Sequence, residues 1–185
     1  ISLALASATV MSARASDNPA GVPAAMARTT VLHTGDVVTG VLPYTQPMHI
    51  VIALKLRNSD QLSSLVAAHQ TLTPAEFSAL YAPTQIQAQA VAAYLTQLGY
   101  KNVVISANRM LVSADGTAGT AKAAFLTSFA RVQTRDGRAA FANNSDAYIP
   151  TTLQGSVLSV IGLQNVYKPH ILAQRAQSYS SVQPF

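Results

Sequence analysis

The 185-residue chain has room for one folded domain with extensions, and 49% of its residues are hydrophobic, enough for a sizeable core. Charged residues make up only 10%, which indicates either a surface partly covered by another protein or a simple enrichment in Ala and Thr. The net charge of +5 without a Lys/Arg run argues against nucleic-acid binding, and the lack of cysteine excludes a disulfide framework and thiolate chemistry.

Residues 1–15 resemble the end of a secretory signal, since a short apolar run closes with the small-x-small triplet Ala13-Arg14-Ala15. The alternative is an ordinary Ala-rich helix start. The run is too short to span a membrane. We therefore expect a bacterial chain that is secreted or periplasmic, with a cut after Ala15.

Residues 16–48 contain four prolines and several glycines, which predicts an extended N-terminal arm. Val31-Leu32 and Val37-Val38 are candidate short strands at a sheet edge. Residues 49–57 form the clearest strand, because apolar side chains alternate along it. One face is expected to hold Ile50, Ile52, Leu54 and Leu56, and the other His49, Val51, Ala53, Lys55 and Arg57.

Three helices are predicted next. Asn58 or Ser59 caps the first, whose apolar stripe is Leu62, Leu65 and Val66. The run Thr73-Pro74-Ala75-Glu76 is a capping box that opens the second, which stops before Pro83. The third starts at Thr84 and ends at the left-handed cap Gly99. Its inward residues are expected to be Ile86, Ala90, Val91, Tyr94, Leu95 and Leu98.

A strand over 100–106 and a turn at Ala107-Asn108 lead into a second clear strand at 109–113. Asp115-Gly116 has the composition of a turn. Thr117 then caps a helix whose apolar stripe is Ala118, Ala121, Phe125 and Phe129.

The rest of the chain predicts a strand from Arg131 to Arg135, a hairpin turn at Asp136-Gly137 and a returning strand at 138–141. A short helix from Thr151 is expected to bury Val157, Val160 and Ile161. Residues 171–185 show no periodicity and are interpreted as a linker.

From residue 49 the order of elements is strand, helices, strand, strand, helix, strand. This predicts an α+β, ferredoxin-like domain over 49–170, in which a split βαβ antiparallel sheet carries helices on one face.

No set of side chains indicates an active site. Glu76 is explained by its capping box, and the six aspartates are scattered, several of them in turns. The four histidines, His33, His49, His69 and His170, lack a metal-ligand spacing. The strands at 49–57 and 109–113 carry no aromatic side chains on which RNA bases could stack. A binding module is favoured over an enzyme, and no cofactor is expected in this chain.

Several short sequence motifs occur in the order found in one known protein family. They are Leu72-Thr73-Pro74-Ala75-Glu76-Phe77, Tyr81-Ala82-Pro83-Thr84, Leu98-Gly99-Tyr100, Asn108-Arg109-Met110-Leu111-Val112-Ser113, Phe141-Ala142-Asn143-Asn144-Ser145-Asp146 and Val160-Ile161-Gly162-Leu163-Gln164-Asn165. Together they resemble the activation domain of the sedolisin family, the serine-carboxyl or kumamolisin-like peptidases. One departure is Ala67-Ala68-His69, where the family often has a Tyr-His pair.

The resemblance implies a propeptide that helps a peptidase domain to fold, blocks its cleft and is removed by self-cleavage at acid pH. It also implies that the catalytic residues and a calcium site lie in the peptidase domain, either beyond Phe185 or on another chain. This chain itself would then have no catalytic activity and would bind neither nucleic acid nor membrane.

The sheet face without helices is the predicted docking surface for that peptidase domain, with Val51, Ala53, Lys55, Arg57, Arg109 and Leu111 as candidate contacts. Solvation, or coverage by the N-terminal arm, is the alternative for these residues. Activation cleavage is expected in the linker, in the region of Arg175, Tyr179 and Phe185.

Acid release is expected because carboxylates of the peptidase would lose their pairing with basic residues when they protonate. Histidines buried neutral in the interface would act in the same direction, and histidines paired with carboxylates in the opposite one.

Two other classes stay open. The first is a free-standing peptidase inhibitor of the same fold, which the sequence downstream of Phe185 would distinguish. The second is a small enzyme or nucleic-acid binder, which the absence of a catalytic set and of stacking aromatics disfavours.

Overall fold

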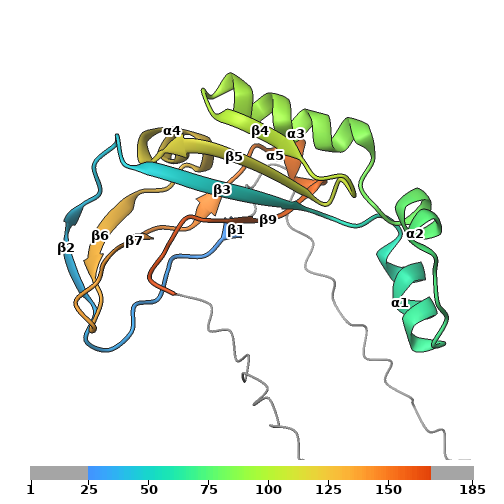
Figure 1. The fold of residues 1–185 in the computed structure, drawn as a ribbon, viewed down its shortest axis with the longest axis horizontal. Helices are drawn as coiled ribbons and strands as arrows, with labels where there is room; N and C mark the ends of the chain where they lie inside the picture. Colours follow the sequence, from blue (N-terminus) through green and yellow to red (C-terminus); the bar gives the residue numbers. More distant parts are fainter. Residues whose placement is uncertain (1–24, 168–185) are drawn as a thin grey trace, which may run out of the picture.

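A computed structural model describes residues 25–167, which form a mixed α+β structure whose paired strands are all antiparallel (Figure 1). The predicted signal remnant and the predicted cleavage region lie outside these residues. None of the helices within 25–167 is long and apolar enough to cross a bilayer.

The central sheet has four strands in the order β4-β5-β3-β9. They are β3 (Pro47–Leu54), β4 (Lys101–Ile105), β5 (Leu111–Thr117) and β9 (Val157–Ile161). The helices α3 (Gln85–Gln97) and α4 (Ala118–Phe125) share one buried cluster with Ile50 and Ile52 of β3. Both helices therefore pack on the face towards which the even-numbered side chains of β3 point, as its sequence predicts.

The α+β class with antiparallel strands is confirmed, and the more specific ferredoxin-like assignment stays a prediction with which the order β3-α3-β4-β5-α4-β9 agrees. The expected fourth strand was wrong, because β9 and not the segment at 131–135 pairs with β3. A register shift opposite Ala53 and Leu54 leaves Leu158 exposed and turns both Val157 and Val160 inward. Because of this bulge, the buried residues Val157 and Val160 of a strand are three positions apart, a spacing that was interpreted as helical in the sequence analysis. Ile161, which was expected to be buried, is 56% exposed.

A second sheet joins three strands in the order β2-β6-β7: β2 (Val37–Val41), β6 (Phe129–Gln133) and β7 (Ala139–Asn143). The edge strand expected at Val37-Val38 is present, whereas Val31-Leu32 lies outside any strand. A short pair joins β1 (Ala25–Ala27) to β8 (Ala147–Tyr148). Met26 and Leu42 are buried in the main core, so the described part of the N-terminal arm is packed into the domain.

The central strand β5 runs through Asp115 and Gly116, where the sequence predicts a turn. Gly116 has no left-handed backbone, and a Cβ atom there would lie 2.6 Å from the ring of Tyr100. The glycine is therefore needed for the close approach of a buried aromatic ring, and not for a turn.

The capping predictions at Thr73, Thr84 and Thr117 are confirmed, whereas Asn58 occupies the N-cap position of α1 without a capping hydrogen bond from its side chain. Thr73, Thr84 and Thr117 each accept a backbone hydrogen bond from the third helical residue, in reciprocal capping boxes. Several apolar assignments were wrong. Ile86 is 79% exposed and Ala90 is also exposed, because α3 buries Ala88, Val91 and Leu95. Val66 of the first helix stripe is 66% exposed, and Phe129 belongs to β6 because α4 ends at Phe125.

Two short helices, α1 (Ser59–Ala67) and α2 (Pro74–Leu80), form an arm that projects from one end of the sheet (Figure 1). Neither helix contains a buried residue. The one-turn helix α5 (Thr151–Gln154) leads into β9. The fold thus combines a covered sheet face, an open sheet face and a projecting arm.

The two faces of the sheet predict different costs for the same substitution. Ile52→Ala should lower the free energy of unfolding by about 2–5 kcal/mol, because a fully buried side chain leaves a cavity under α3 and α4. Ile161→Ala, on the open face, should lower it by less than about 1 kcal/mol. Urea denaturation measures both, and equal losses would contradict the sidedness of the sheet.

Candidate docking face

The open face is built first from the cross-strand pairs of β3 and β5. The register places Ala53 opposite Leu111, Val51 opposite Ser113 and His49 opposite Asp115. These side chains alternate with the buried ones, so they lie on the face opposite α3 and α4. Three of the predicted contacts, Val51, Ala53 and Leu111, are thereby brought together.

The outer strands widen this apolar centre. Val104 of β4 lies opposite Ser113, and Ile161 of β9 lies opposite Val51. Val104, Leu111 and Ile161 are 57%, 42% and 56% exposed. Contiguous exposed apolar side chains with a polar rim are typical of protein-binding surfaces. Sequence analysis missed Val104 and Ile161, since only the strand register reveals which side of the sheet they occupy.

A charged row closes one end of the face. Lys101, Asp115 and His49 are cross-strand neighbours on β4, β5 and β3. The His49 Nδ1 atom lies 2.6 Å from Asp115 Oδ1, and the Asn102 side-chain amide donates to Asp115 Oδ2 at 2.8 Å. Hydrogen bonding from His49, and then from Asn102, holds the pKa of the Asp115 carboxyl below its usual value.

This pairing corrects the premise of the acid-release argument, which treated the histidines as lacking acidic neighbours. His49 has one, and His33, His49 and His69 are all exposed in the described part of the chain. Residues 49 and 115 are 66 positions apart, so no local signal could have revealed the pair.

Arg57 and Arg109 are engaged within the domain. Arg57 donates to the carbonyls of Ala82 at 2.6 Å and Ala79 at 2.5 Å. Arg109 donates to the carbonyls of Pro83 at 2.7 Å and Ser78 at 3.0 Å. Each guanidinium group thus binds one carbonyl group in the last turn of α2 and one in the segment just after it, where the helix dipole favours positive charge. A contact of either arginine with a partner stays a prediction.

Lys55 follows the last residue of β3 and donates from Nζ to the Gln154 carbonyl at 2.9 Å. It is exposed, so this contact leaves it available to a carboxylate of a partner. With Lys101 at the opposite end of the face, the apolar centre has a lysine near each end.

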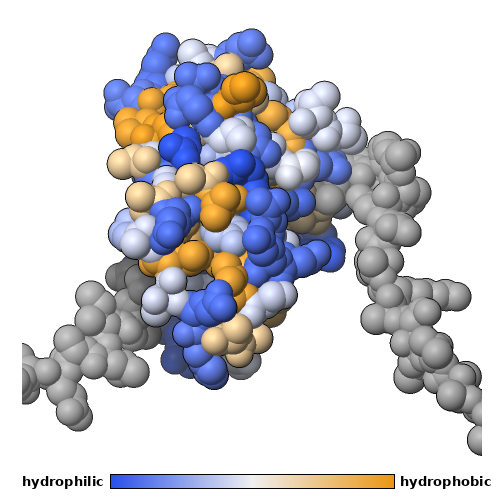
Figure 2. All heavy atoms as spheres, turned by 90° about the vertical axis from the view of Figure 1, so that its right-hand side faces the viewer, coloured by the Kyte–Doolittle hydropathy of each residue, from blue (hydrophilic) through white to orange (hydrophobic). Residues whose placement is uncertain are grey.

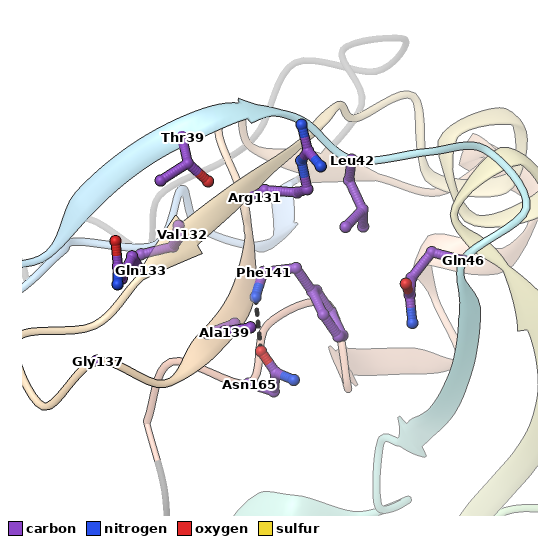
Figure 3. A pocket seen from close by; sticks show the side chains of 11 residues that line it. Thr39, Leu42, Gln46, Arg131, Val132, Gln133, Gly137, Ala139, Phe141 and Asn165 are labelled. Carbon is purple, nitrogen blue, oxygen red and sulfur yellow. Dashed lines mark hydrogen bonds between the residues drawn. The ribbon is translucent and has the colours of Figure 1, made fainter.

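A separate groove of about 400 Å³ lies beside the three-stranded sheet. Figure 3 shows Arg131, Leu42, Gln46 and Phe141 around it, with Asn165 accepting a hydrogen bond from the Phe141 amide. The lining contains one cation and no carboxylate or histidine, so it offers no acid–base pair for catalysis.

The carboxylates of residues 25–167 have structural partners in most cases. Glu76 completes its capping box, Asp136 bonds Thr134 in the hairpin turn, and Asp146 bonds Thr29 and Arg28. No group of three metal-ligating side chains lies together within this range. The open face also carries no Phe, Tyr or Trp in β3 or β5, so it lacks the stacking platform of RNA-binding sheets.

Comparison with known proteins identifies the fold's family. The family model described as "Pro-kumamolisin, activation domain" matches residues 34–166. The chain belongs to this family.

Two bacterial relatives agree with this assignment. Xanthomonalisin of Xanthomonas sp. (strain T-22) is 44% identical over 147 residues, which are 75% of this chain and 18% of the relative. Sedolisin of Pseudomonas sp. (strain 101) is 43% identical over 131 residues, 66% of this chain and 22% of the relative. The pro-kumamolisin activation domain described above thus spans about a fifth of each relative.

The hydrogen bonds of Asp115 predict a pH dependence of stability. Because its folded-state pKa is lowered, the stabilisation is present above the unfolded value of about 3.9 and is lost as pH falls through the folded value. Asp115→Asn should therefore show a smaller drop in urea midpoint than the parent protein between pH 5 and pH 2. Parallel pH profiles of the two proteins would contradict this role for the carboxylate.

Proposed function

We propose that this activation domain is the propeptide of a sedolisin-family peptidase precursor and docks on the peptidase domain through the open face of its four-stranded sheet. The supporting observation is the exposed apolar face of the sheet. The two relatives are several times longer than the part that this chain matches, so their remaining length can hold a domain that covers such a face. Docked in this way, the domain acts as an intramolecular chaperone and as an inhibitor. Self-cleavage at acid pH then removes it.

The energetics of the face support protein binding. Because Val104, Leu111 and Ile161 are about half exposed, each would contribute about 0.7–1.5 kcal/mol if a partner covered the rest of the side chain. An antiparallel sheet with one helix-covered face also presents a preformed, rigid surface, which lowers the entropic cost of association. A nascent peptidase domain would gain the same free energy, which is how docking assists folding.

Three further parts of this proposal concern regions outside the described residues. Activation cleavage falls in the linker near Arg175, Tyr179 and Phe185, because residues 171–185 show no core periodicity in their sequence and such segments are preferred cleavage sites. The chain is exported, as the apolar run before Ala15 indicates. The calcium site belongs to the peptidase domain.

The docking face predicts a selective loss of inhibition. Residues 1–185 should inhibit a purified sedolisin-family peptidase in trans and cleave no peptide when alone. Leu111→Asp should weaken inhibition at least about tenfold, because a carboxylate would be buried among apolar side chains.

Ile86→Asp is the matched control, since Ile86 is 79% exposed on α3, away from the docking face. It should leave the inhibition constant unchanged. Equal weakening by both substitutions, or proteolysis by the pure chain, would contradict the proposal.

The proposed acid release has a defined sign. Peptidase carboxylates paired with Lys55 and Lys101 would have lowered pKa values in the complex, so the separated proteins bind more protons. Complex stability is then lost as pH falls through those lowered values, below about pH 4. Because His49 is already bonded to Asp115, the lysines carry this argument.

Affinity for a catalytically inactive peptidase should therefore fall as pH drops from about 4.5 to 3, and replacing both lysines by Gln should flatten the profile. Isothermal titration calorimetry from pH 7 to about pH 3 measures both. Constant or tighter binding at about pH 3 would leave cleavage as the sole trigger.

A further inference from the structure

No side chain of residues 59–80, which contain the α1–α2 arm, is fully buried. Burial starts at Tyr81, whose ring lies beside that of Phe77. Val66 and Leu80 are 66% and 46% exposed, and no residue of either helix is buried. Neither helix packs extensively against a strand or another helix of the described chain. A hollow of about 420 Å³ lies between Leu72, Phe77 and the turn at Asn108 and Met110. Figure 2 shows the end of the molecule that carries this arm, with apolar and polar side chains interspersed over it.

The two helices of the arm are not equally secured. The arginine contacts described above hold the carboxyl end of α2, and the Thr73 capping box closes its amino end. By contrast, the side chain of the N-cap residue Asn58 does not cap the first amides of α1. Asn58 adopts a left-handed backbone and donates from Nδ2 to the Leu80 carbonyl of α2 at 3.0 Å, a contact within the arm. A nine-residue helix without buried side chains is marginal in water.

The connection between the helices is equally independent of the domain. The amides of Ala68, His69 and Gln70 donate to carbonyls of α1 itself. Thr73 donates to Glu76 of α2. His69 has a φ of 53°, a conformation that non-glycine residues seldom adopt. Opening α1 and this loop therefore breaks contacts within the arm and leaves the main core intact.

A protease binds its substrate as an extended segment, so cleavage inside a folded domain occurs where a segment can open locally at low cost. We propose that residues 67–72 of the arm are a second, internal cleavage site at which an endopeptidase inactivates the released propeptide. Water supplies the hydroxyl that ends on the carbonyl carbon and the proton that ends on the leaving amine as the peptide bond breaks. The inactivation step rests on the proposed inhibitory function, whereas the location of the cut does not.

The topology explains why a cut here would end inhibition. Residues 67–72 lie on the connection between β3 and α3. Hydrolysis there leaves β3 on one fragment and β4, β5 and β9 on the other. Val51 and Ala53 of the docking face would then belong to one fragment, and Leu111 and Ile161 to the other. Association of two fragments depends on concentration, so the face is lost on dilution.

Limited proteolysis of residues 1–185 with proteinase K tests the location. Apart from cuts before residue 25 or after residue 167, the first cut detected by intact mass should fall within 67–72. Trypsin is the control protease. Because no Lys or Arg lies between Arg57 and Lys101, trypsin cannot cut within residues 67–72 and should give no fragment that ends there. A first internal cut by proteinase K elsewhere, for instance in the hairpin at 134–138, would overturn the proposal.

A pair of substitutions in α1 tests the mechanism. Ser64 is exposed and its hydroxyl bonds the Asp60 carbonyl one turn earlier. Ser64→Gly should be cut about fivefold faster than Ser64→Ala, because the helix propensities of the two residues differ by that factor. Ala93→Gly is the matched control in α3, since Ala93 is exposed on a helix that packs on the sheet. Equal rates for the Ser64 pair, or equal acceleration by Ala93→Gly, would indicate global unfolding and overturn local opening.

Inhibition by the nicked chain tests the consequence. The nicked protein should lose inhibition on dilution to concentrations at which the uncut chain still inhibits. Retained inhibition by the nicked protein at all dilutions would overturn the inactivation step. If the uncut chain does not inhibit at all, the proposed function fails while the mapped cut still stands.

Discussion

The alternation of side chains along β3 is the constraint on which the rest of the structure depends. Ile50, Ile52 and Leu54 are buried towards α3 and α4, while Val51 and Ala53 are directed to the opposite face. Because β3 pairs with both β5 and β9, its register sets which of their side chains join each face. A one-residue slip would expose the core and bury the charged row at His49 and Asp115.

Charge is used differently on the two sides of this domain. At one end of the docking face, Lys101, Asp115 and His49 remain accessible, in a row where one carboxylate lies between two basic side chains. At the base of the arm, Arg57 and Arg109 donate hydrogen bonds to carbonyl groups of α2 and of the segment after it. Basic side chains are therefore accessible at the end of the open face, whereas the two arginines serve to attach α2. Because α2 is held by the two arginines and α1 contains no buried side chain, the local opening that we propose is confined to one short segment.

Much of the local structure could be predicted because it depends on neighbouring residues. The capping boxes at Thr73, Thr84 and Thr117, the left-handed Gly99 and the hairpin at Asp136-Gly137 are decided within a few positions. The errors came from long-range packing. The helix expected from Thr151 ends at Gln154, and Val157 belongs to a bulged strand instead. Gly116 faces the ring of Tyr100 from within β5. Half of the predicted docking residues lie on the open face, whereas the two arginines reach the arm.

Composition and periodicity were enough to predict an α+β domain without a recognisable set of catalytic residues, and the order of the family's sequence motifs indicated its family. These properties depend only on the order of residues along the chain. The tertiary structure decided which strand completes the central sheet, which side chains share its open face and where the charges are paired. Those features join residues far apart in sequence, such as His49 with Asp115 and Arg57 with Ala82. Strand register and helix docking create such neighbours, and no local pattern encodes them.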